Sequence, residues 1–165
     1  MNATTYQTYY QSPVGLLKIG ATDHVINQVL FVNENEEITP VRELSTLLQQ
    51  CIEQLIEYFN GARQVFDLPV YQEGTPFQNR VWSELLNIKF GRTISYLDLA
   101  KRLGDPKVIR AAASSNGKNN ICIIVPCHRV VGTNNSLIGY SGGLPRKKWL
   151  LNHENKIVNG VQTLF

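Results

Sequence analysis

The chain has 165 residues, of which 43% are hydrophobic and 18% charged, and its net charge is +3. These values are typical of one globular domain or two small ones, and no apolar run approaches the roughly 18 residues that cross a bilayer, which argues against a membrane protein. The three cysteines form no CxxC pair, and the first residues lack the basic start and apolar core of a secretory signal. The odd cysteine count suits the reducing cytoplasm, where we expect this protein. With three scattered histidines and no paired thiols, we expect no metal, and we further expect a monomer without another cofactor.

Charge is distributed unevenly along the chain. Residues 1–74 carry three basic and nine acidic side chains, whereas residues 75–165 carry thirteen basic and four acidic ones. A strongly basic half predicts contact with a polyanion such as nucleic acid. A basic face that is merely solvated explains the charge equally well.

The first 74 residues predict a small α+β domain. β-prone residues separated by turn residues indicate an antiparallel meander of three strands, over 6–10, 16–19 and 25–32. Residues 66–70 suggest a further short strand, and residues 71–74 read as the linker to the second domain.

A helix is expected to cover this sheet. Thr39 and Pro40 are typical of a helix start, and Asn60-Gly61 is typical of a helix end. Between them, apolar residues recur at helical spacing: Leu44, Leu47, Leu48, Cys51, Leu55 and Phe59. Because Cys51 lies on this apolar stripe, we interpret it as a small core residue.

Residues 75–165 predict a mainly helical domain. Thr75-Pro76-Phe77-Gln78 and Ser95-Tyr96-Leu97-Asp98 are capping boxes, each of which begins a helix. A third helix, over 105–117, follows directly after Gly104. Two helices joined by a short glycine turn form the helix-turn-helix pattern, although many other helical hairpins share it.

The second helix of that pair has an unusual composition. Three consecutive alanines, Ala111 to Ala113, follow one long cation, Arg110. A helix with so little bulk can enter a DNA groove and insert one side chain. Equally, the alanines can pack against a neighbouring helix while Arg110 extends to solvent. The residues themselves leave both interpretations open.

A thiol and an imidazole follow the most apolar run of the chain. Ile121 to Val125 is continuously apolar and predicts a strand buried on both faces, which Pro126 ends. Cys127 and His128 come next, and this arrangement is suited to forming a thiolate nucleophile. The alternative for His128 is a helix-cap or core histidine.

The rest of the chain predicts a loop and a last helix. Residues 133–143 are rich in Asn, Ser and Gly, which is typical of a mobile loop. Pro145 begins the last helix, with Trp149, Leu150 and Leu151 on its inner face. Residues 155–165 are expected to form a loosely held tail.

Pro126-Cys127-His128-Arg129-Val130 resembles the active-site motif of the O6-alkylguanine-DNA alkyltransferases, which repair DNA by direct reversal. Other motifs of that family occur in the same order: Thr75-Pro76-Phe77-Gln78, Ser95-Tyr96, Arg110-Ala111, Gly139 to Leu144, Lys147, Trp149-Leu150-Leu151 and His153-Glu154. The resemblance is close from Thr75 to Glu154 and holds only in outline before Thr75. It implies irreversible transfer of the alkyl group from O6-alkylguanine in duplex DNA to Cys127, with each molecule used once, and leaves O4-alkylthymine open.

The resemblance also implies a role for each catalytic residue. Cys127 would attack the alkyl carbon as a thiolate, His128 would take its proton, and Glu154 would orient His128. Asn119 would brace the turn beside the active site. Because adjacent residues of an extended segment point in opposite directions, we expect His128 to act on Cys127 through a bridging water.

Contacts with a flipped-out base follow from the same resemblance. The Tyr96 hydroxyl would donate to a ring nitrogen, the backbone N–H of Ser141 would donate to O6, and carbonyls near Val130 would accept from the exocyclic amine. Arg110, with Ala111 beside it on the recognition helix, would fill the gap that the base leaves when the protein binds the minor groove.

The sequence departs from the family at several positions. Residues that differ from those common there are Asn120, Ala112, Ala113 and Ser115, and they leave open which alkyl groups fit. The zinc ligands of some members are absent. Two other functions fit parts of the sequence: a DNA-binding damage sensor without chemistry, and a cysteine hydrolase that uses the same Cys, His and Glu.

Overall fold

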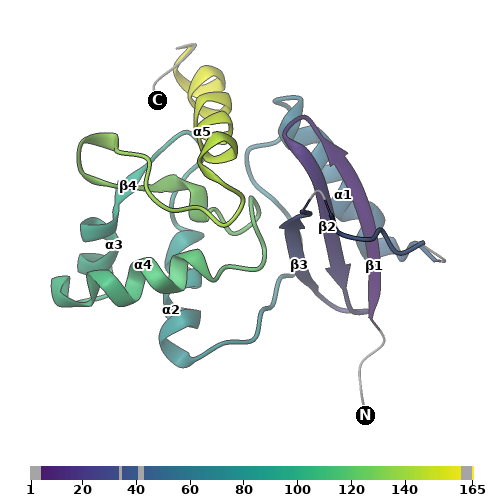
Figure 1. Ribbon diagram of the computed structural model, residues 1–165, viewed down its shortest axis with the longest axis horizontal. Coiled ribbons are helices and arrows are strands. Elements are labelled where there is room, and N and C mark those ends of the chain that lie inside the picture. The colour runs from purple at the N-terminus through teal and green to yellow at the C-terminus, as the bar shows by residue number, and fades with distance from the viewer. Residues whose placement is uncertain (1–4, 34, 41–42, 161–164) are drawn as a thin grey trace. The chain divides into compact units, whose positions relative to one another are not determined.

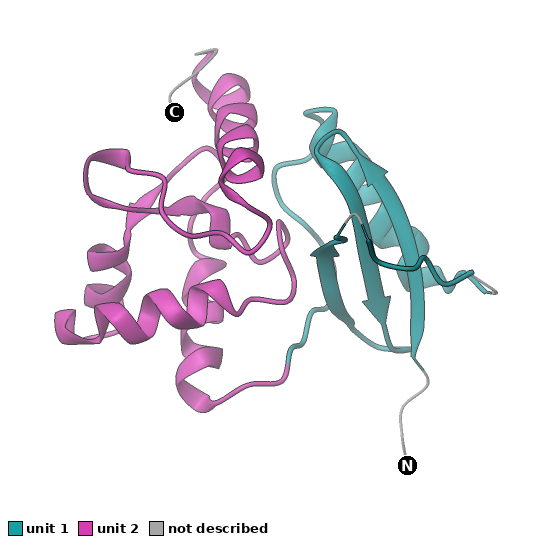
Figure 2. Cartoon of the chain, in the orientation of Figure 1, with its two compact units in different colours: residues 1–72 teal, residues 73–165 magenta. Residues whose placement is uncertain are grey.

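The structure is a computed structural model that describes residues 5–33, 35–40, 43–160 and 165. The chain divides into two compact units, residues 1–72 and 73–165 (Figure 2). The first unit is an antiparallel sheet with one long helix, and the second is mainly helical (Figure 1). This arrangement confirms the predicted α+β class.

Three strands form the sheet of the first unit in the order β1-β2-β3: β1 Tyr6–Ser12, β2 Gly15–Ala21 and β3 Ile26–Phe31. Both pairings are antiparallel, and Ser12 pairs with Gly15 across a tight turn that fixes the register. Leu17 and Ile19, two residues apart on β2, are fully buried, as expected for one face of a strand. The predicted meander is therefore confirmed.

Helix α1, Thr46–Phe59, packs against all three strands through its apolar stripe (Figure 1). Leu48, Cys51 and Leu55 are fully buried there, so Cys51 is a core residue as predicted. The helix ends at Asn60, also as predicted.

The predicted start of α1 is wrong. The N-cap is Ser45, whose hydroxyl accepts the Leu48 N–H at 3.2 Å and so satisfies a donor that lacks a partner within the helix. Thr39 lies outside the helix and donates its N–H to the Tyr9 hydroxyl at 3.2 Å. Residues 41 and 42, which the predicted helix included, lie outside the described residues.

The strand predicted at residues 66–70 is also wrong. Val70 makes only an isolated parallel bridge with Ile26. Ile26 donates to the Pro69 carbonyl at 2.8 Å, but Pro69 has no N–H to continue a ladder.

The second unit contains four α-helices, three short 3-10 helices and a two-stranded parallel sheet within its described residues. Their bounds are α2 Pro76–Leu85, β4 Ile94–Ser95, α3 Tyr96–Arg102, η1 Pro106–Val108, α4 Ile109–Gly117, η2 Cys127–Arg129, β5 Val130–Val131, η3 Thr133–Asn135 and α5 Leu144–Asn159. α2, α3 and α4 pack against one another, and both predicted capping boxes are present. The indole N–H of Trp82 donates to the Ser115 carbonyl at 2.9 Å and fastens α2 to α4.

Helices α3 and α4 form the predicted helix-turn-helix, with Gly104 in the turn at a φ of 102° that favours glycine. Arg110 and Ala111 are exposed on α4, whereas Ala112 is fully buried. The packing interpretation therefore holds for Ala112, which packs inward while Arg110 faces solvent, and entry of this helix into a DNA groove stays a prediction.

The strand predicted at residues 121–125 is wrong, although its side chains are buried. These residues form a compact turn, closed by a hydrogen bond from the Val125 N–H to the Ile121 carbonyl at 3.0 Å. A short apolar run indicates burial and does not by itself specify extended backbone.

The tail predicted from residue 155 is wrong for residues 155–159. Helix α5 continues through Asn159 and ends at Gly160, which has a left-handed conformation. Asn155 is 5% exposed because it faces the interior of the unit. Residues 161–164 of the predicted tail lie outside the described residues.

Candidate active site

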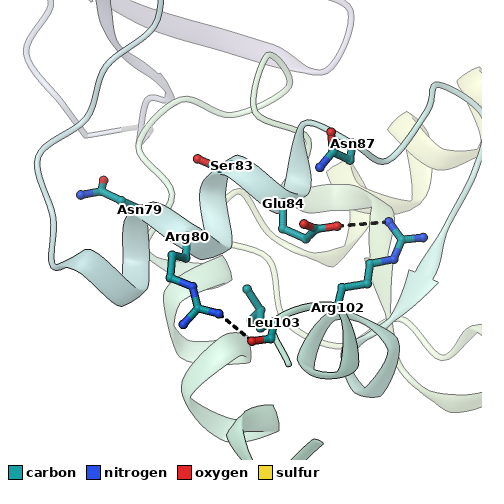
Figure 3. Close-up of a pocket in the computed structure, with 7 residues that line it drawn as sticks. All are labelled: Asn79, Arg80, Ser83, Glu84, Asn87, Arg102 and Leu103. Carbon is teal, nitrogen blue, oxygen red and sulfur yellow. Dashed lines mark hydrogen bonds and ion pairs between the residues drawn. The ribbon is translucent and has the colours of Figure 1, made fainter. Parts of the chain in front are cut away.

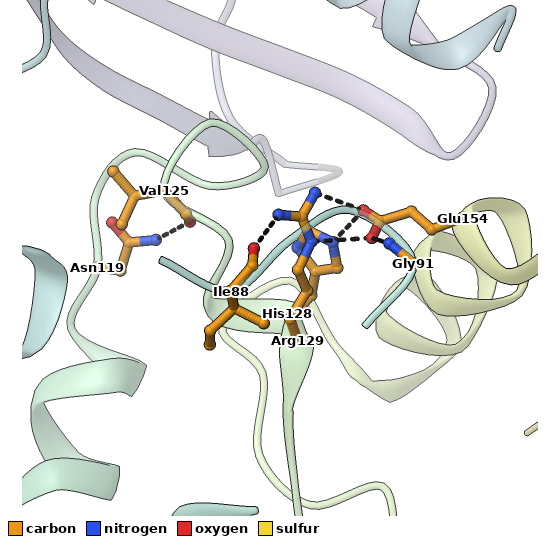
Figure 4. A network of polar contacts seen from close by, with 7 residues as sticks. All are labelled: Ile88, Gly91, Asn119, Val125, His128, Arg129 and Glu154. Carbon is orange, nitrogen blue, oxygen red and sulfur yellow. Dashed lines mark hydrogen bonds and ion pairs between the residues drawn. The ribbon is translucent and has the colours of Figure 1, made fainter. Parts of the chain in front are cut away.

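Asn119 holds the turn that precedes Cys127. Its side-chain carbonyl accepts the Ile121 N–H at 3.0 Å, and its amide donates to the Val125 carbonyl at 2.8 Å (Figure 4). The side chain is 2% exposed, so these bonds satisfy backbone groups that water does not reach. Cys122 and burial raise the pKa of the Cys127 thiol, and the interaction of Asn119 with that thiol partly opposes the rise.

Replacing Asn119 with alanine is expected to lower the free energy of unfolding of the second unit by about 2–4 kcal/mol, because at least two buried backbone groups lose their partners. Urea unfolding followed by tryptophan fluorescence measures the effect. The matched control is Asn87→Ala at an exposed site, with an expected change within about 0.5 kcal/mol. Equal losses in the two variants would contradict the bracing role.

His128, Arg129 and Glu154 form a buried network (Figure 4). Nε2 of His128 lies 2.6 Å from Oε2 of Glu154, and Nε of Arg129 donates to Oε1 of Glu154 at 2.8 Å. Arg129 also donates to the Ile88 carbonyl at 2.7 Å. His128 is therefore buried, as expected of a core histidine. Unlike a purely structural residue, its ring is held in one orientation by the Glu154 carboxylate.

The network determines which nitrogen of His128 carries hydrogen. Burial lowers the pKa of His128, with Glu154 opposing the shift, so the ring is neutral at pH 7. A carboxylate only accepts, so Nε2 carries the hydrogen and Nδ1 presents its lone pair. Nδ1 is buried and has no hydrogen-bond partner within the described part of the chain. It is therefore the available acceptor for a proton.

Burial by itself raises the pKa of Glu154, but the His128 and Arg129 interactions outweigh it and hold that pKa well below its usual range. The carboxylate is also fixed by the Gly91 N–H, which donates to Oε1 at 3.0 Å. Gly91 has a φ of 77°, and a Cβ there would lie 2.5 Å from the Val158 side chain. The glycine is thus required for the close approach of this loop to α5.

Cys127 begins the 3-10 turn η2 and is 3% exposed. Its hydrogen bond with Cys122 and its burial raise its pKa, opposed by the Asn119 hydrogen bond and the Lys147 charge. The resting thiol is therefore protonated, and its reaction needs a base. Residues 127–129 form a 3-10 turn, so the extended backbone that we expected at Cys127 and His128 is wrong. A water that bridges the two side chains stays a prediction.

Lys147 is fully buried on α5 and was not among the predicted catalytic residues. Its ammonium donates to the carbonyls of Val130, Ile138 and Gly139 at 2.6, 2.9 and 3.0 Å. Burial lowers its pKa to about 8, opposed by Cys127. Lys147 thus ties the loop after η3 to α5 and supplies positive charge near Cys127.

The residues expected to contact a base lie around this centre. Strand β4 pairs with β5, Ile94 opposite Val130, which brings the start of α3 beside the segment after Cys127. The Tyr96 hydroxyl donates to the Ile138 carbonyl at 2.8 Å, and Ser141 Oγ lies 3.8 Å from Cys122 Sγ. Exposed Arg110 and Ala111 lie on α4, apart from this buried network.

A surface cavity of about 370 Å³ lies between α2 and the end of α3 (Figure 3). Arg80 donates to the Leu103 carbonyl there at 2.6 Å, and Arg102 lies 3.6 Å from Glu84. None of the predicted site residues lines the cavity. Its arginines are occupied by bonds between the two helices, so we assign it a structural role.

In the described part of the chain, no helix is long and apolar enough to cross a membrane. Nor do the described residues include a cluster of three or more His, Cys, Asp or Glu side chains suited to a metal ion.

Two family models match the chain. Residues 5–72 match the ribonuclease-like domain of 6-O-methylguanine DNA methyltransferase, and residues 76–156 match its DNA binding domain. The methylated-DNA--protein-cysteine methyltransferase of Bacillus subtilis (the constitutive one) is 39% identical over 156 residues, which cover 90% of this chain and 94% of the relative.

Solved structures are similar over nearly the whole chain. The O6-methylguanine methyltransferase of Mycobacterium tuberculosis superimposes with a TM-score of 0.85 at 35% identity, covering 96% of this chain and 97% of that one. The complex of Mycobacterium tuberculosis OGT with DNA gives a TM-score of 0.82 at 36% identity, covering 92% and 93%. With both domains matched and the identity sustained along the chain, the protein belongs to the 6-O-methylguanine DNA methyltransferase family.

Proposed function

We propose that the chain repairs alkylated DNA by transferring the alkyl group from O6 of guanine to Sγ of Cys127, with each molecule used once. The observation that carries the proposal is the position of Cys127 directly before His128, whose ring is held by the buried Glu154 carboxylate. DNA is the partner of this family, and direct reversal of the damage is its function.

The chemistry starts from a neutral thiol and a neutral imidazole. Nδ1 of His128 takes the Cys127 proton, by way of one water, as Sγ attacks the alkyl carbon. A carbon–sulfur bond forms as the carbon–O6 bond breaks, and the electron pair of that bond leaves with guanine as an anion. The guanine anion then takes up a proton from water, and His128 returns its extra proton to water, so the net transfer is from the thiol to the base. Glu154 stabilises the imidazolium, and the Lys147 charge favours the thiolate while it forms.

The departing base needs hydrogen bonds as negative charge develops on it. The Tyr96 hydroxyl leaves the Ile138 carbonyl, to which it donates in the absence of DNA, and donates instead to a ring nitrogen of the base. The Ser141 backbone N–H donates to O6. The Val130 carbonyl already accepts from Lys147, but a carbonyl has a second lone pair for the exocyclic amine.

The base must leave the helical stack to reach a thiol that is 3% exposed. Helix α4 presents exposed Arg110 beside the small residue Ala111, a surface that fits the minor groove while the arginine fills the gap. Residues 75–165 thus act as the DNA-binding and transfer domain, and residues 1–74 form the N-terminal domain. We propose that the chain works as a monomer in the cytoplasm.

The experiment that tests this function incubates the protein with duplex DNA that carries a labelled O6-methyl group on one guanine. We expect one label per molecule, recovered on Cys127, and no further transfer when fresh DNA is added. Binding without transfer would instead favour a damage sensor, and repeated turnover on small esters would favour a cysteine hydrolase.

Replacing Arg110 with alanine is expected to slow transfer from duplex DNA by about tenfold or more, since unstacking a base costs a few kcal/mol that the arginine offsets. Single-stranded substrate needs less unstacking, so the loss there should be smaller. Lys107→Ala removes another exposed cation and serves as the control, with similar losses on both substrates. Undiminished duplex transfer by the Arg110 variant would remove this arginine from the mechanism.

A further inference from the structure

Cys122 contacts Cys127, and the proposed transfer gives it no role. Both side chains are buried, and the two thiols interact with each other, since Cys122 raises the pKa of Cys127 and Cys127 lowers that of Cys122. On its other side, Cys122 Sγ lies 3.8 Å from the hydroxyl of Ser141. The sequence alone hid this pairing, because a strand over these residues would keep the two sulfurs apart.

The compact turn between the cysteines creates the pair. If the five-residue step were extended, it would span about 16 Å, far beyond the reach of a disulfide. Instead, the Ile124 N–H donates to the Cys122 carbonyl and the Cys127 N–H donates to the Val125 carbonyl, both at 2.8 Å. Ile123 has a φ of 74°, which a β-branched residue rarely adopts, so the surrounding structure imposes the turn.

The chain's remaining cysteine provides a contrast. Cys51 is fully buried in the core of the first unit, and burial raises the pKa of its thiol to about 12. Burial is the only cause of that shift, so nothing beside Cys51 stabilises a thiolate, and the thiol is inert. In the pair, by comparison, the remaining S–H stabilises a thiolate on its neighbour once one proton has left.

We propose that Cys122 is a resolving thiol, which forms a reversible disulfide with Cys127 when hydrogen peroxide oxidises the pair. One sulfur attacks the peroxide, the O–O bond breaks, and a sulfenic acid and one water result. The other sulfur attacks the sulfenic sulfur, forming the S–S bond and releasing the oxygen as a second water. Overall, two thiols are oxidised to one disulfide and one peroxide is reduced to two waters, which carry away both thiol hydrogens.

The consequence for repair rests on the proposed function of Cys127 as the alkyl acceptor. A Cys127 held in a disulfide accepts no alkyl group until a dithiol reduces the bond. Without a neighbour, the sulfenic acid oxidises further to a sulfinic acid that dithiols do not restore. Cys122 therefore converts a permanent loss of the acceptor into a temporary one.

The test uses the full chain, treated with hydrogen peroxide and digested with trypsin. Cleavage after Lys118 and Arg129 gives one peptide, residues 119–129, that contains both cysteines of the pair and excludes Cys51. We expect this peptide to lose both thiol hydrogens and to resist iodoacetamide until dithiothreitol is added. Cys122→Ser and Cys127→Ser are the matched variants, and in each the single remaining sulfur should gain oxygen atoms that dithiothreitol does not remove.

Recovery of the parent peptide with a free Cys122 and a sulfinic Cys127 would overturn the proposal, as would a peptide left unoxidised. Alkyl transfer, measured on the same samples, separates this proposal from the proposed function. Transfer without disulfide formation refutes only the resolving role of Cys122. A disulfide in a protein that never accepts an alkyl group refutes only the assigned chemistry of Cys127.

Discussion

Cys127→Ala is expected to abolish alkyl transfer completely while binding to duplex DNA persists. The substitution removes the proposed nucleophile, and no rearrangement of His128 or Glu154 replaces a sulfur atom. Alanine leaves the exposed face of α4 unchanged, and the η2 turn is closed by a backbone hydrogen bond from the Arg129 N–H to the Pro126 carbonyl at 3.1 Å. Transfer is measured with labelled O6-methylguanine duplex, and binding with fluorescence anisotropy of the same duplex.

Cys51→Ala is the control for the loss of a buried thiol. Cys51 lies in the core of the first unit, so its replacement should leave the label on Cys127 unchanged. Because Cys122 contacts Cys127, fragmentation of the peptide 119–129 is needed to assign the label to one sulfur. Label on the Cys127→Ala protein would identify a different acceptor and contradict the mechanism.

The parts of this structure that follow from sequence are those fixed by near neighbours. The capping boxes at Thr75 and Ser95 form as predicted because each joins residues three apart. The start of α1 was misplaced because a threonine followed by proline does not require a helix. The Thr39 N–H donates instead to the hydroxyl of Tyr9, 30 positions away, and Ser45 caps the helix. Residues 121–125 were misread because burial on all sides suits a turn as well as a strand.

The candidate site required longer-range information. The pairing of His128 with Glu154 joins residues 26 positions apart, and its prediction came from a family resemblance. Gly91 and Lys147 received no catalytic role, because Gly91 acts on a carboxylate 63 positions away and Lys147 acts through backbone carbonyls. The sequence also carries a sign of Glu154 that does not depend on the resemblance. It is one of only four acidic residues in the basic half, so few other carboxylates there could pair with His128.

Glu154→Gln is expected to lower the free energy of unfolding of the second unit by about 3–5 kcal/mol, although glutamine has nearly the same size. The change leaves the Arg129 charge buried without its counter-ion. It also sets an amide NH₂ among donors, because His128, Arg129 and Gly91 all donate to this carboxylate. Urea unfolding followed by fluorescence measures the loss, and both tryptophans, Trp82 and Trp149, belong to the second unit.

The matched control is Glu84→Gln in the same unit, which breaks a partly exposed ion pair with Arg102 at 3.6 Å. An exposed pair contributes about 0–1 kcal/mol, so this variant should unfold almost as the parent does. Similar losses of unfolding free energy in both variants would show that the buried network stabilises the fold no more than an exposed ion pair does.

The pH dependence of this difference provides a second measurement. Because the folded protein holds the pKa of Glu154 below the ordinary glutamate value of 4.5, the carboxylate stabilises the fold fully above that value. Its contribution is lost as the pH falls from there towards the depressed pKa, where the parent also becomes protonated. The gap in unfolding free energy between the parent and Glu154→Gln should therefore be constant near neutral pH and narrow in acid. A gap that stays the same throughout acid would mean that the glutamine acts through packing, and that the carboxylate charge does not hold His128 and Arg129 in place.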